Sequence, residues 1–124
     1  MIFGTGVDII EVERIEKTLR NDKYDIISGA FTPNEITYCQ SKKNDAEIYA
    51  GLFAAKEAFL KALGTGWRYG ISWREIEVTF KRNKYILSPS GEAASRCSGN
   101  KIKKIHLSIN TTKQAATAVV ILEK

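Results

Sequence analysis

The chain has 124 residues, which is enough for one domain whose hydrophobic core needs no disulfide or metal support. Apolar residues make up 44% of it and charged residues 27%, an ordinary globular composition, and no apolar run approaches the roughly 20 residues of a membrane-spanning helix. The formal net charge of +5 fits an acidic partner or serves solubility alone. The lysines are scattered and not interleaved with aromatic residues, which disfavours a nucleic-acid-binding module. We therefore predict a single domain over residues 1–124, with neither a membrane nor nucleic acid as a partner.

The cysteines and the first residues indicate the cellular compartment of the protein. Cys39 and Cys97 are far apart and lack the spacing of metal ligands. Residues 1–4 carry no basic flank and lead directly into strand-like sequence, which argues against a secretory signal peptide. We expect a cytoplasmic protein with two reduced thiols.

The first twenty residues predict a strand followed by a helix. Residues 2–10 are rich in Val and Ile and are expected to form a buried strand, with Gly4 and Gly6 as interruptions. Residues 11–20 then change period. Their apolar side chains are spaced three and four residues apart, which places them on one face of an amphipathic helix; they are Val12, Ile15 and Leu19.

A second helix should begin at Thr32. Thr32 is expected to cap it, Pro33 to take its first position and Glu35 to complete a capping box. This helix should end by residues 39–41, where a polar loop follows.

A long third helix follows that loop. Asn44 or Asp45 can cap it, and Gly64 supplies the left-handed residue that ends it. One stripe of apolar side chains runs along its length, as an amphipathic helix requires; the stripe consists of Ile48, Leu52, Ala55, Phe59 and Ala62.

The second half of the chain is mostly strands. Apolar and polar residues alternate over 76–81, a turn is expected at Arg82-Asn83, and a return strand over 84–87. A shorter helix should then run from Ser88-Pro89 to about Gly99, followed by strands over 102–110 and 115–122. The last strand is apolar on both faces, so we expect it to be buried on both. The predicted fold is a compact α+β domain with a long helix on an antiparallel sheet.

Asp8 is an acid inside an apolar run. Its neighbours on both sides are apolar, so its carboxylate must be desolvated, paired with a cation or bonded to backbone N–H groups. A purely structural role at the strand end explains it as well as a functional one.

Glu57 and Lys61 stand one helical turn apart, with the acid first. Most such pairs are solvated surface features. Two features favour a site here. Alanines keep this helix thin enough for a backbone or a ligand to approach, and Lys61 leads into a turn bounded by Gly64 and Gly66 that can wrap a phosphate.

The chemistry that fits these residues is phosphoryl transfer assisted by a hard cation. Asp8 and Glu57 would offer two oxygen ligands to Mg²⁺, which completes its shell with water and substrate phosphate. Clusters for zinc and the glycine-rich nucleotide-binding motifs are missing. His106, the sole histidine, lies opposite the apolar face of its strand, so a Ser–His–Asp triad has little support.

These residues also resemble a known family, the holo-acyl-carrier-protein synthases, which are short bacterial 4′-phosphopantetheinyl transferases. The resemblance rests first on residues 6–10 (Gly-Val-Asp-Ile-Ile) with Arg14 and on residues 53–66, and it extends over the whole chain. The later matches are Trp73, Ile76, Glu77, Ser108, Ile109, Ala116, Ala118 and Val120.

The resemblance implies transfer of the phosphopantetheine arm of coenzyme A to a serine of an apo acyl carrier protein, releasing adenosine 3′,5′-bisphosphate. It implies Asp8 and Glu57 as Mg²⁺ ligands and Glu57 and Lys61 as catalytic residues. It further implies a homotrimer whose sites are shared between subunits. Coenzyme A would be held with Lys61, Gly64 and Thr111, and the acidic carrier protein would dock with Arg14.

Three positions depart from the family pattern, and all three are associated with holding coenzyme A. Leu52 stands where the family usually has Arg, and Asn110-Thr111 where it usually has Ser-His or Thr-His. Residues 82–84 replace a Gly-x-Pro turn. Three hypotheses result: an active transferase, a degenerate protein that binds carrier protein or coenzyme A without catalysis, and a small basic nucleic-acid-binding domain. The third leaves Asp8 and Glu57 unexplained.

Overall fold

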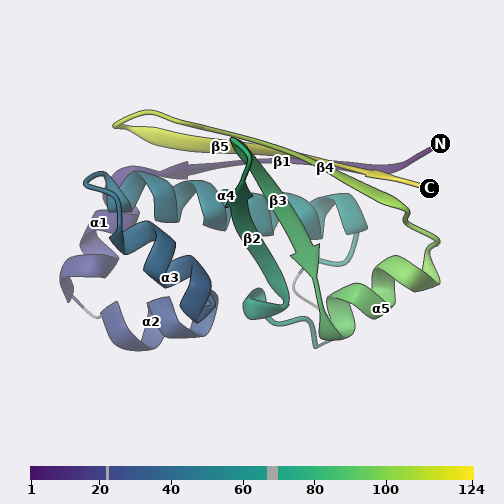
Figure 1. Cartoon of the computed structure of the whole chain (residues 1–124), viewed down its shortest axis with the longest axis horizontal. Helices are drawn as coiled ribbons and strands as arrows, with labels where there is room; N and C mark the ends of the chain where they lie inside the picture. The colour runs from purple at the N-terminus through teal and green to yellow at the C-terminus, as the bar shows by residue number, and fades with distance from the viewer. Residues whose placement is uncertain (22, 67–69) are drawn as a thin grey trace.

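The computed structural model describes residues 1–21, 23–66 and 70–124 (Figure 1). The elements follow one another along the chain as β1 (Ile2–Glu11), α1 (Val12–Asn21), α2 (Lys23–Ala30), α3 (Pro33–Gln40), α4 (Asp45–Leu63), the short 3-10 helix η1 (Trp73–Glu75), β2 (Ile76–Lys81), β3 (Lys84–Pro89), α5 (Gly91–Gly99), β4 (Lys104–Thr111) and β5 (Ala115–Glu123).

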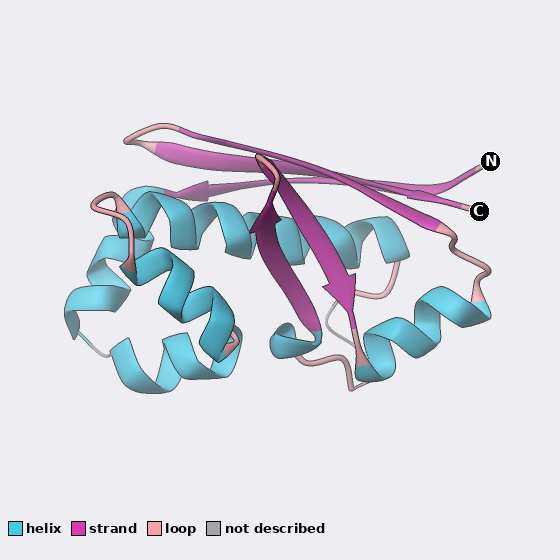
Figure 2. Cartoon of the chain, in the orientation of Figure 1, coloured by secondary structure: helices cyan, strands magenta, loops and turns pink. Residues whose placement is uncertain are grey.

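The long helix α4 is the centre of the molecule. An antiparallel sheet of order β1-β5-β4 lies along one side of it, and the separate β2–β3 hairpin packs against another side. Helices α1, α2 and α3 gather toward one end of α4 and α5 toward the other (Figure 2). The predicted α+β class, with a long helix on an antiparallel sheet, is confirmed. Among the residues that the structure describes, no helix has both the length and the apolar content to cross a membrane.

Strand β1 extends from Ile2 to Glu11. Its pairing with β5 shifts register between Ile2 and Gly4 but is regular through Gly6, so the prediction that both glycines interrupt the strand is wrong. Both glycines face α4, where a Cβ on Gly4 would lie 2.0 Å from the carbonyl oxygen of Ala62. A Cβ on Gly6 would lie 1.9 Å from the carbonyl oxygen of Ala58. The glycines are therefore where the strand backbone touches the helix backbone, and the alanines of α4 leave room for that contact.

Only one face of the three-stranded sheet is covered. Val7 and Ile9 of β1 are 56% and 63% exposed, and Val119 of β5 is 38% exposed. Val7 and Val119 are register partners, so these side chains share the face that points away from α4. The expectation that the first strand is buried and the last is buried on both faces therefore fails for the single chain.

The helix signals near residue 32 are confirmed, and those near residue 44 only in part. Thr32 and Glu35 form the predicted capping box, and Gly64 ends α4 with a left-handed φ of 83°. Asn44 occupies the N-cap of α4 but its side chain makes no cap hydrogen bond. Asp45 acts instead, because its Oδ1 accepts from the N–H of Ala46 at 2.8 Å.

One helix has no sequence prediction, and one helix begins later than predicted. The helix without a prediction is α2. The helix expected at Ser88-Pro89 begins at Gly91 with Ser90 as N-cap, while Pro89 closes β3 opposite Ile76. Proline is compatible with that terminal strand position, so a Ser-Pro pair marked the end of a strand. The Arg82-Asn83 turn is confirmed, with both residues at positive φ.

Candidate functional site

The site is built around Asp8 on the inner face of β1. The side chain of Asp8 is only 12% exposed. The ammonium group of Lys61 donates to its Oδ1 at 2.7 Å and to the carbonyl oxygen of Val7 at 3.2 Å. Lys61 therefore crosses from α4 to β1. Its ion pair is with Asp8, the residue that sequence spacing had not linked to it.

One oxygen of Asp8 is left without a partner. Within the described part of the chain, Oδ2 of Asp8 is buried and accepts no hydrogen bond when Glu57 is ionised, because a carboxylate beside Asp8 can donate to it only when protonated. A buried carboxylate oxygen in this condition is unfavourable by roughly 1–3 kcal/mol or more. A cation bound at Oδ2 would remove that penalty, which makes this atom the strongest local evidence for a ligand.

Glu57 is the second carboxylate of the site. Burial raises its pKa, and the negative charge of Asp8 raises it further, while Lys61 and Arg14 lower it. Two carboxylates that repel each other in a partly buried place favour occupation by a cation. The pKa of Lys61 is raised, chiefly by its hydrogen bond to Asp8, so Lys61 remains protonated beside both acids.

The donor set fits Mg²⁺. Among the described residues no group of three or more His, Cys, Asp or Glu side chains is arranged to hold a metal. Mg²⁺ does not require one, because it keeps several waters and commonly uses one or two carboxylates plus substrate phosphates. Asp8 and Glu57 would supply those two carboxylates.

Arg14 lies at the edge of this site. It is exposed on α1, and its charge acts on Glu57. It also lines a mostly apolar cavity of about 200 Å³ between α1, α2 and α4, with Ile10 and Phe53 among the other lining residues. An arginine at the mouth of an apolar cavity suits an acidic partner that also offers apolar side chains.

The remaining predicted residues are divided between two places. Gly64 is exposed at the end of α4, one turn past Lys61. Thr111 lies on β4, in the row that runs from Ile10 of β1 across Ala116 of β5. Since β1 and β4 are the two edges of the sheet, one chain does not bring Thr111 to Asp8.

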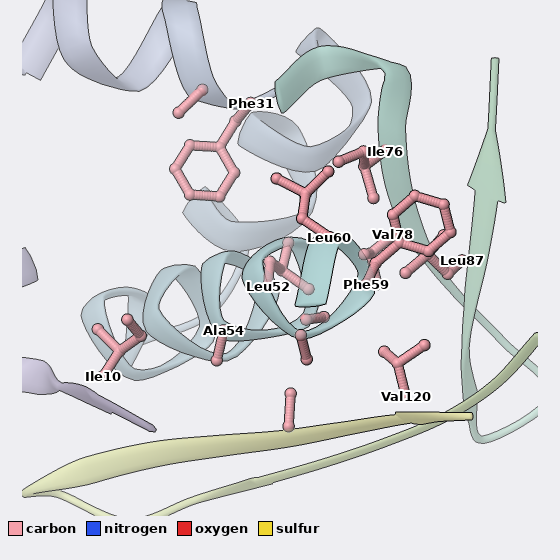
Figure 3. Packing of buried hydrophobic residues seen from close by; sticks show 14 of the residues in the cluster. Ile10, Phe31, Leu52, Ala54, Phe59, Leu60, Ile76, Val78, Leu87 and Val120 are labelled. Carbon is pink, nitrogen blue, oxygen red and sulfur yellow. The ribbon is translucent and has the colours of Figure 1, made fainter. Parts of the chain in front are cut away.

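Leu52 does not lie on a binding surface. It is 1% exposed and belongs to the same buried cluster as Phe31, Leu60 and Ile76 (Figure 3). An arginine side chain in this place would be enclosed in the hydrophobic core. Leu52 therefore serves packing in this chain.

A buried ion pair was missed by the sequence analysis. Lys56 and Glu35 are both fully buried, with Nζ to Oε1 at 2.9 Å. Lys56 also donates to the carbonyl oxygens of Trp73 and Ile76, at 2.9 and 2.8 Å. Glu35 Oε2 accepts from the N–H of Val78 at 2.7 Å.

The signal for this pair was present in the sequence. Lys56 lies four residues from both Leu52 and Leu60, which are buried, so helical spacing places it on the apolar face. Burial lowers its pKa, and the Glu35 carboxylate opposes that change. The pair ties α3, η1 and β2 to α4.

His106 is paired with an acid on the surface of the sheet. It is exposed on β4, and its Nε2 lies 2.9 Å from Oε1 of Glu123. The hydrogen bond to His106 lowers the pKa of Glu123. The placement opposite the apolar face of the strand is as predicted.

Comparisons with known proteins identify the family of the chain. A family model described as the 4′-phosphopantetheinyl transferase superfamily matches residues 4–120. A holo-[acyl-carrier-protein] synthase of Geobacter sp. (strain M21) is 45% identical over 127 residues, covering 100% of both chains. The holo-[acyl-carrier-protein] synthase of Geotalea daltonii is 41% identical over 125 residues, with the same coverage.

Solved structures of similar proteins have the same fold. The crystal structure of the holo-[acyl-carrier-protein] synthase from Neisseria meningitidis gives a TM-score of 0.89 at 31% identity and covers 100% of both chains. A holo-(acyl-carrier-protein) synthase from Bacillus anthracis, in complex with CoA (3′,5′-ADP), gives 0.82 at 41% identity and covers 100% of this chain and 98% of that one. The chain belongs to the holo-[acyl-carrier-protein] synthase family of 4′-phosphopantetheinyl transferases.

Proposed function

We propose that this enzyme acts in the cytoplasm and transfers the 4′-phosphopantetheine arm of coenzyme A to a serine of an apo acyl carrier protein. The reaction would require Mg²⁺ and release adenosine 3′,5′-bisphosphate. The observation that carries the proposal is the buried, unpartnered Oδ2 of Asp8 beside Glu57 and Lys61. A relative bound to CoA supports coenzyme A as the donor.

In the transfer, the serine hydroxyl loses its proton to a carboxylate or a water of the site, and its oxygen attacks the β-phosphorus of coenzyme A. A new P–O bond forms, and the bond from that phosphorus to the bridging oxygen breaks, so that adenosine 3′,5′-bisphosphate leaves with the electron pair. Mg²⁺ held by Asp8 and Glu57 would neutralise charge on the phosphate oxygens. Lys61, oriented by Asp8, adds a second positive charge on the same oxygens.

The protein residues around the site have two further roles in this proposal. The turn at Gly64 leaves backbone space next to Lys61 for the phosphates. Arg14, exposed on α1, offers a positive charge to the acidic carrier protein.

The separation of Thr111 from Asp8 supports a site shared between copies. Within one chain they lie on opposite edges of the sheet. We propose a homotrimer in which Asp8, Glu57 and Lys61 of one subunit meet Thr111 of the next. The exposed apolar face around Val119 offers a surface for that assembly.

The test is a mass measurement of the carrier. The protein is incubated with coenzyme A, Mg²⁺ and an apo acyl carrier protein, and the carrier is weighed for the added arm. Asp8→Ala and Glu57→Ala should each abolish transfer while the fold persists, and the double variant should be little worse, because both residues hold one ion. Glu92→Ala is the matched control and should retain activity, because the carboxylate of Glu92 pairs with Arg96 within α5.

Two outcomes would contradict the proposal. Near-normal activity of Asp8→Ala or Glu57→Ala at low millimolar Mg²⁺ would remove the metal assignment. Carrier binding by the unaltered protein without any mass change would favour the non-catalytic alternative, for which Leu52 and Thr111 are the sequence basis.

A further inference from the structure

Strand β1 meets helix α4 through a contact between backbones. Residues on one face of a strand alternate, so Gly4, Gly6 and Asp8 all face α4. The first two touch α4 where a side chain cannot fit, since a Cβ would lie 2.0 and 1.9 Å from the carbonyl oxygens of Ala62 and Ala58. Asp8 is the next residue on the same face, so its carboxylate is held wherever that contact places the strand.

The contact points on α4 adjoin the charged residues of the site. Ala58, which meets Gly6, follows Glu57 in the chain, and Ala62, which meets Gly4, follows Lys61. Both obstructing atoms are backbone carbonyl oxygens of a helix, and no rotamer change can move them. A side chain at Gly6 would therefore have to push β1 away from α4 by about 1 Å, because packed interiors have no spare space at such a contact.

We propose that Gly6 is a positioning residue that sets the separation of Asp8 and Glu57 and so fits the site to a small divalent cation. The inference rests on the proposed metal site. It adds that the close strand–helix contact restricts which cation is bound. Gly6 acts through Asp8 and touches neither ion nor substrate.

The physical basis is the difference in bond length between two hard cations. Mg²⁺ binds oxygen at about 2.0–2.1 Å and demands near-octahedral geometry, whereas Ca²⁺ binds at about 2.3–2.6 Å with flexible geometry. A site whose Asp8 is fixed relative to α4 by backbone contact suits the ion with the stricter geometry, which is Mg²⁺. Moving β1 outward should therefore weaken Mg²⁺ binding more than Ca²⁺ binding.

The experiment measures cation binding, not activity. Mn²⁺ binding to the full chain is followed by electron paramagnetic resonance, and Mg²⁺ and Ca²⁺ are each titrated in to displace it. For the unaltered protein we expect Mg²⁺ to bind more tightly than Ca²⁺. For Gly6→Ala we expect the Kd ratio of Mg²⁺ to Ca²⁺ to rise about tenfold or more, a change of about 1.4 kcal/mol in relative binding. Gly99→Ala is the matched control, since a Cβ there meets nothing within 4 Å.

The ratio separates positioning from mere destabilisation. Partial unfolding of Gly6→Ala would weaken both ions by one factor and leave the ratio unchanged, and an unchanged ratio overturns the inference. If Gly6→Ala does not fold, the test is the relative affinity of the unaltered protein for Mg²⁺ and Ca²⁺. Equal affinity for the two ions, or tighter binding of Ca²⁺, overturns the inference. Absence of any Mn²⁺, Mg²⁺ or Ca²⁺ binding by the unaltered protein would overturn the metal site itself, and with it this inference.

Discussion

At the scale of single residues, the site is held in an unfavourable state when no cation is bound. Burial and the charge of Asp8 both raise the pKa of Glu57. The carboxylate form of Glu57 therefore opposes folding at neutral pH. The stability that its protonated form contributes is present below the pKa of an unfolded glutamate and is lost as pH rises through the higher pKa of the folded state.

The raised pKa of Glu57 predicts how Glu57→Gln changes stability. Without divalent cations, at pH 7.5 with a chelator present, the variant should have a higher melting temperature than the unaltered protein, because the repulsion with Asp8 is gone. The difference should shrink as pH falls below 4. Added Mg²⁺ should stabilise the unaltered protein and leave Glu57→Gln unchanged. Thermal unfolding checks both parts, and a variant that melts lower at pH 7.5 would contradict them.

The buried pair of Lys56 and Glu35 gives a second prediction at this scale. Lys56→Met should lower the free energy of unfolding by about 3–5 kcal/mol, because it leaves the carboxylate of Glu35 buried without its cation. Urea denaturation measures the loss. Lys17→Met is the control: Lys17 pairs with Glu13 on the exposed surface at 3.6 Å, and its removal should change stability by less than about 0.5 kcal/mol.

At the scale of elements, the end of α5 carries a strained residue. Lys101 follows the helix with φ of 60°, a left-handed conformation that glycine adopts without strain. Lys101→Gly should therefore raise the free energy of unfolding by roughly 0.5–1 kcal/mol. Lys103→Gly, two residues further, has no left-handed φ and should not stabilise. Equal effects in urea denaturation would remove the explanation.

Thr111 and Leu52 both depart from the family pattern, but they lie in different places, Thr111 on β4 and Leu52 on the core face of α4. Substitutions at the two positions should therefore have different effects. Thr111 is partly exposed on β4, so Thr111→His can add a contact to coenzyme A phosphate and lower the KM for coenzyme A about tenfold. Steady-state kinetics with varied coenzyme A measure this. An unchanged KM would mean that Thr111 does not face the nucleotide.

Leu52→Arg should behave differently from Thr111→His. Its guanidinium would be enclosed in the core, and stability should fall by several kcal/mol. Ile86→Arg, at a position that is 42% exposed on the β2–β3 hairpin, is the control and should be tolerated. An equally stable Leu52→Arg protein in urea denaturation would show that α4 can turn this position outward.

At the scale of the whole molecule, the proposed homotrimer would cover the outer face of the sheet. Light scattering of the unaltered protein should give the mass of a trimer. Val119→Lys should give a smaller species and lose transferase activity, because it places a charge on the exposed apolar face and separates Asp8 from the Thr111 of a neighbour. Ile86→Lys, also exposed but on the hairpin, should remain a trimer. A monomeric unaltered protein would contradict the shared site.

The sequence by itself determined most of the elements and the family, and it supplied the candidate residues of the site. The capping box at Thr32, the left-handed end at Gly64 and the alternation of β4 are all patterns within a few neighbouring residues. Such patterns depend on local backbone geometry, which is why they can be read without the fold. The family resemblance added the proposed roles of Asp8 and Glu57 as Mg²⁺ ligands, since spacing alone had left both residues open between structure and function.

Only the tertiary structure decided which residues meet. Lys61 pairs with Asp8, 53 residues earlier, although its helical neighbour Glu57 was the partner that spacing offered. The glycines of β1, which resembled interruptions, became contact points with a helix that begins some forty residues later. Lys56 became buried through Glu35 and two backbone carbonyls from separate segments. Contacts of this kind depend on how elements distant in sequence pack against each other. The free energy of burying two such residues depends on both partners together, so neither sequence segment predicts it alone.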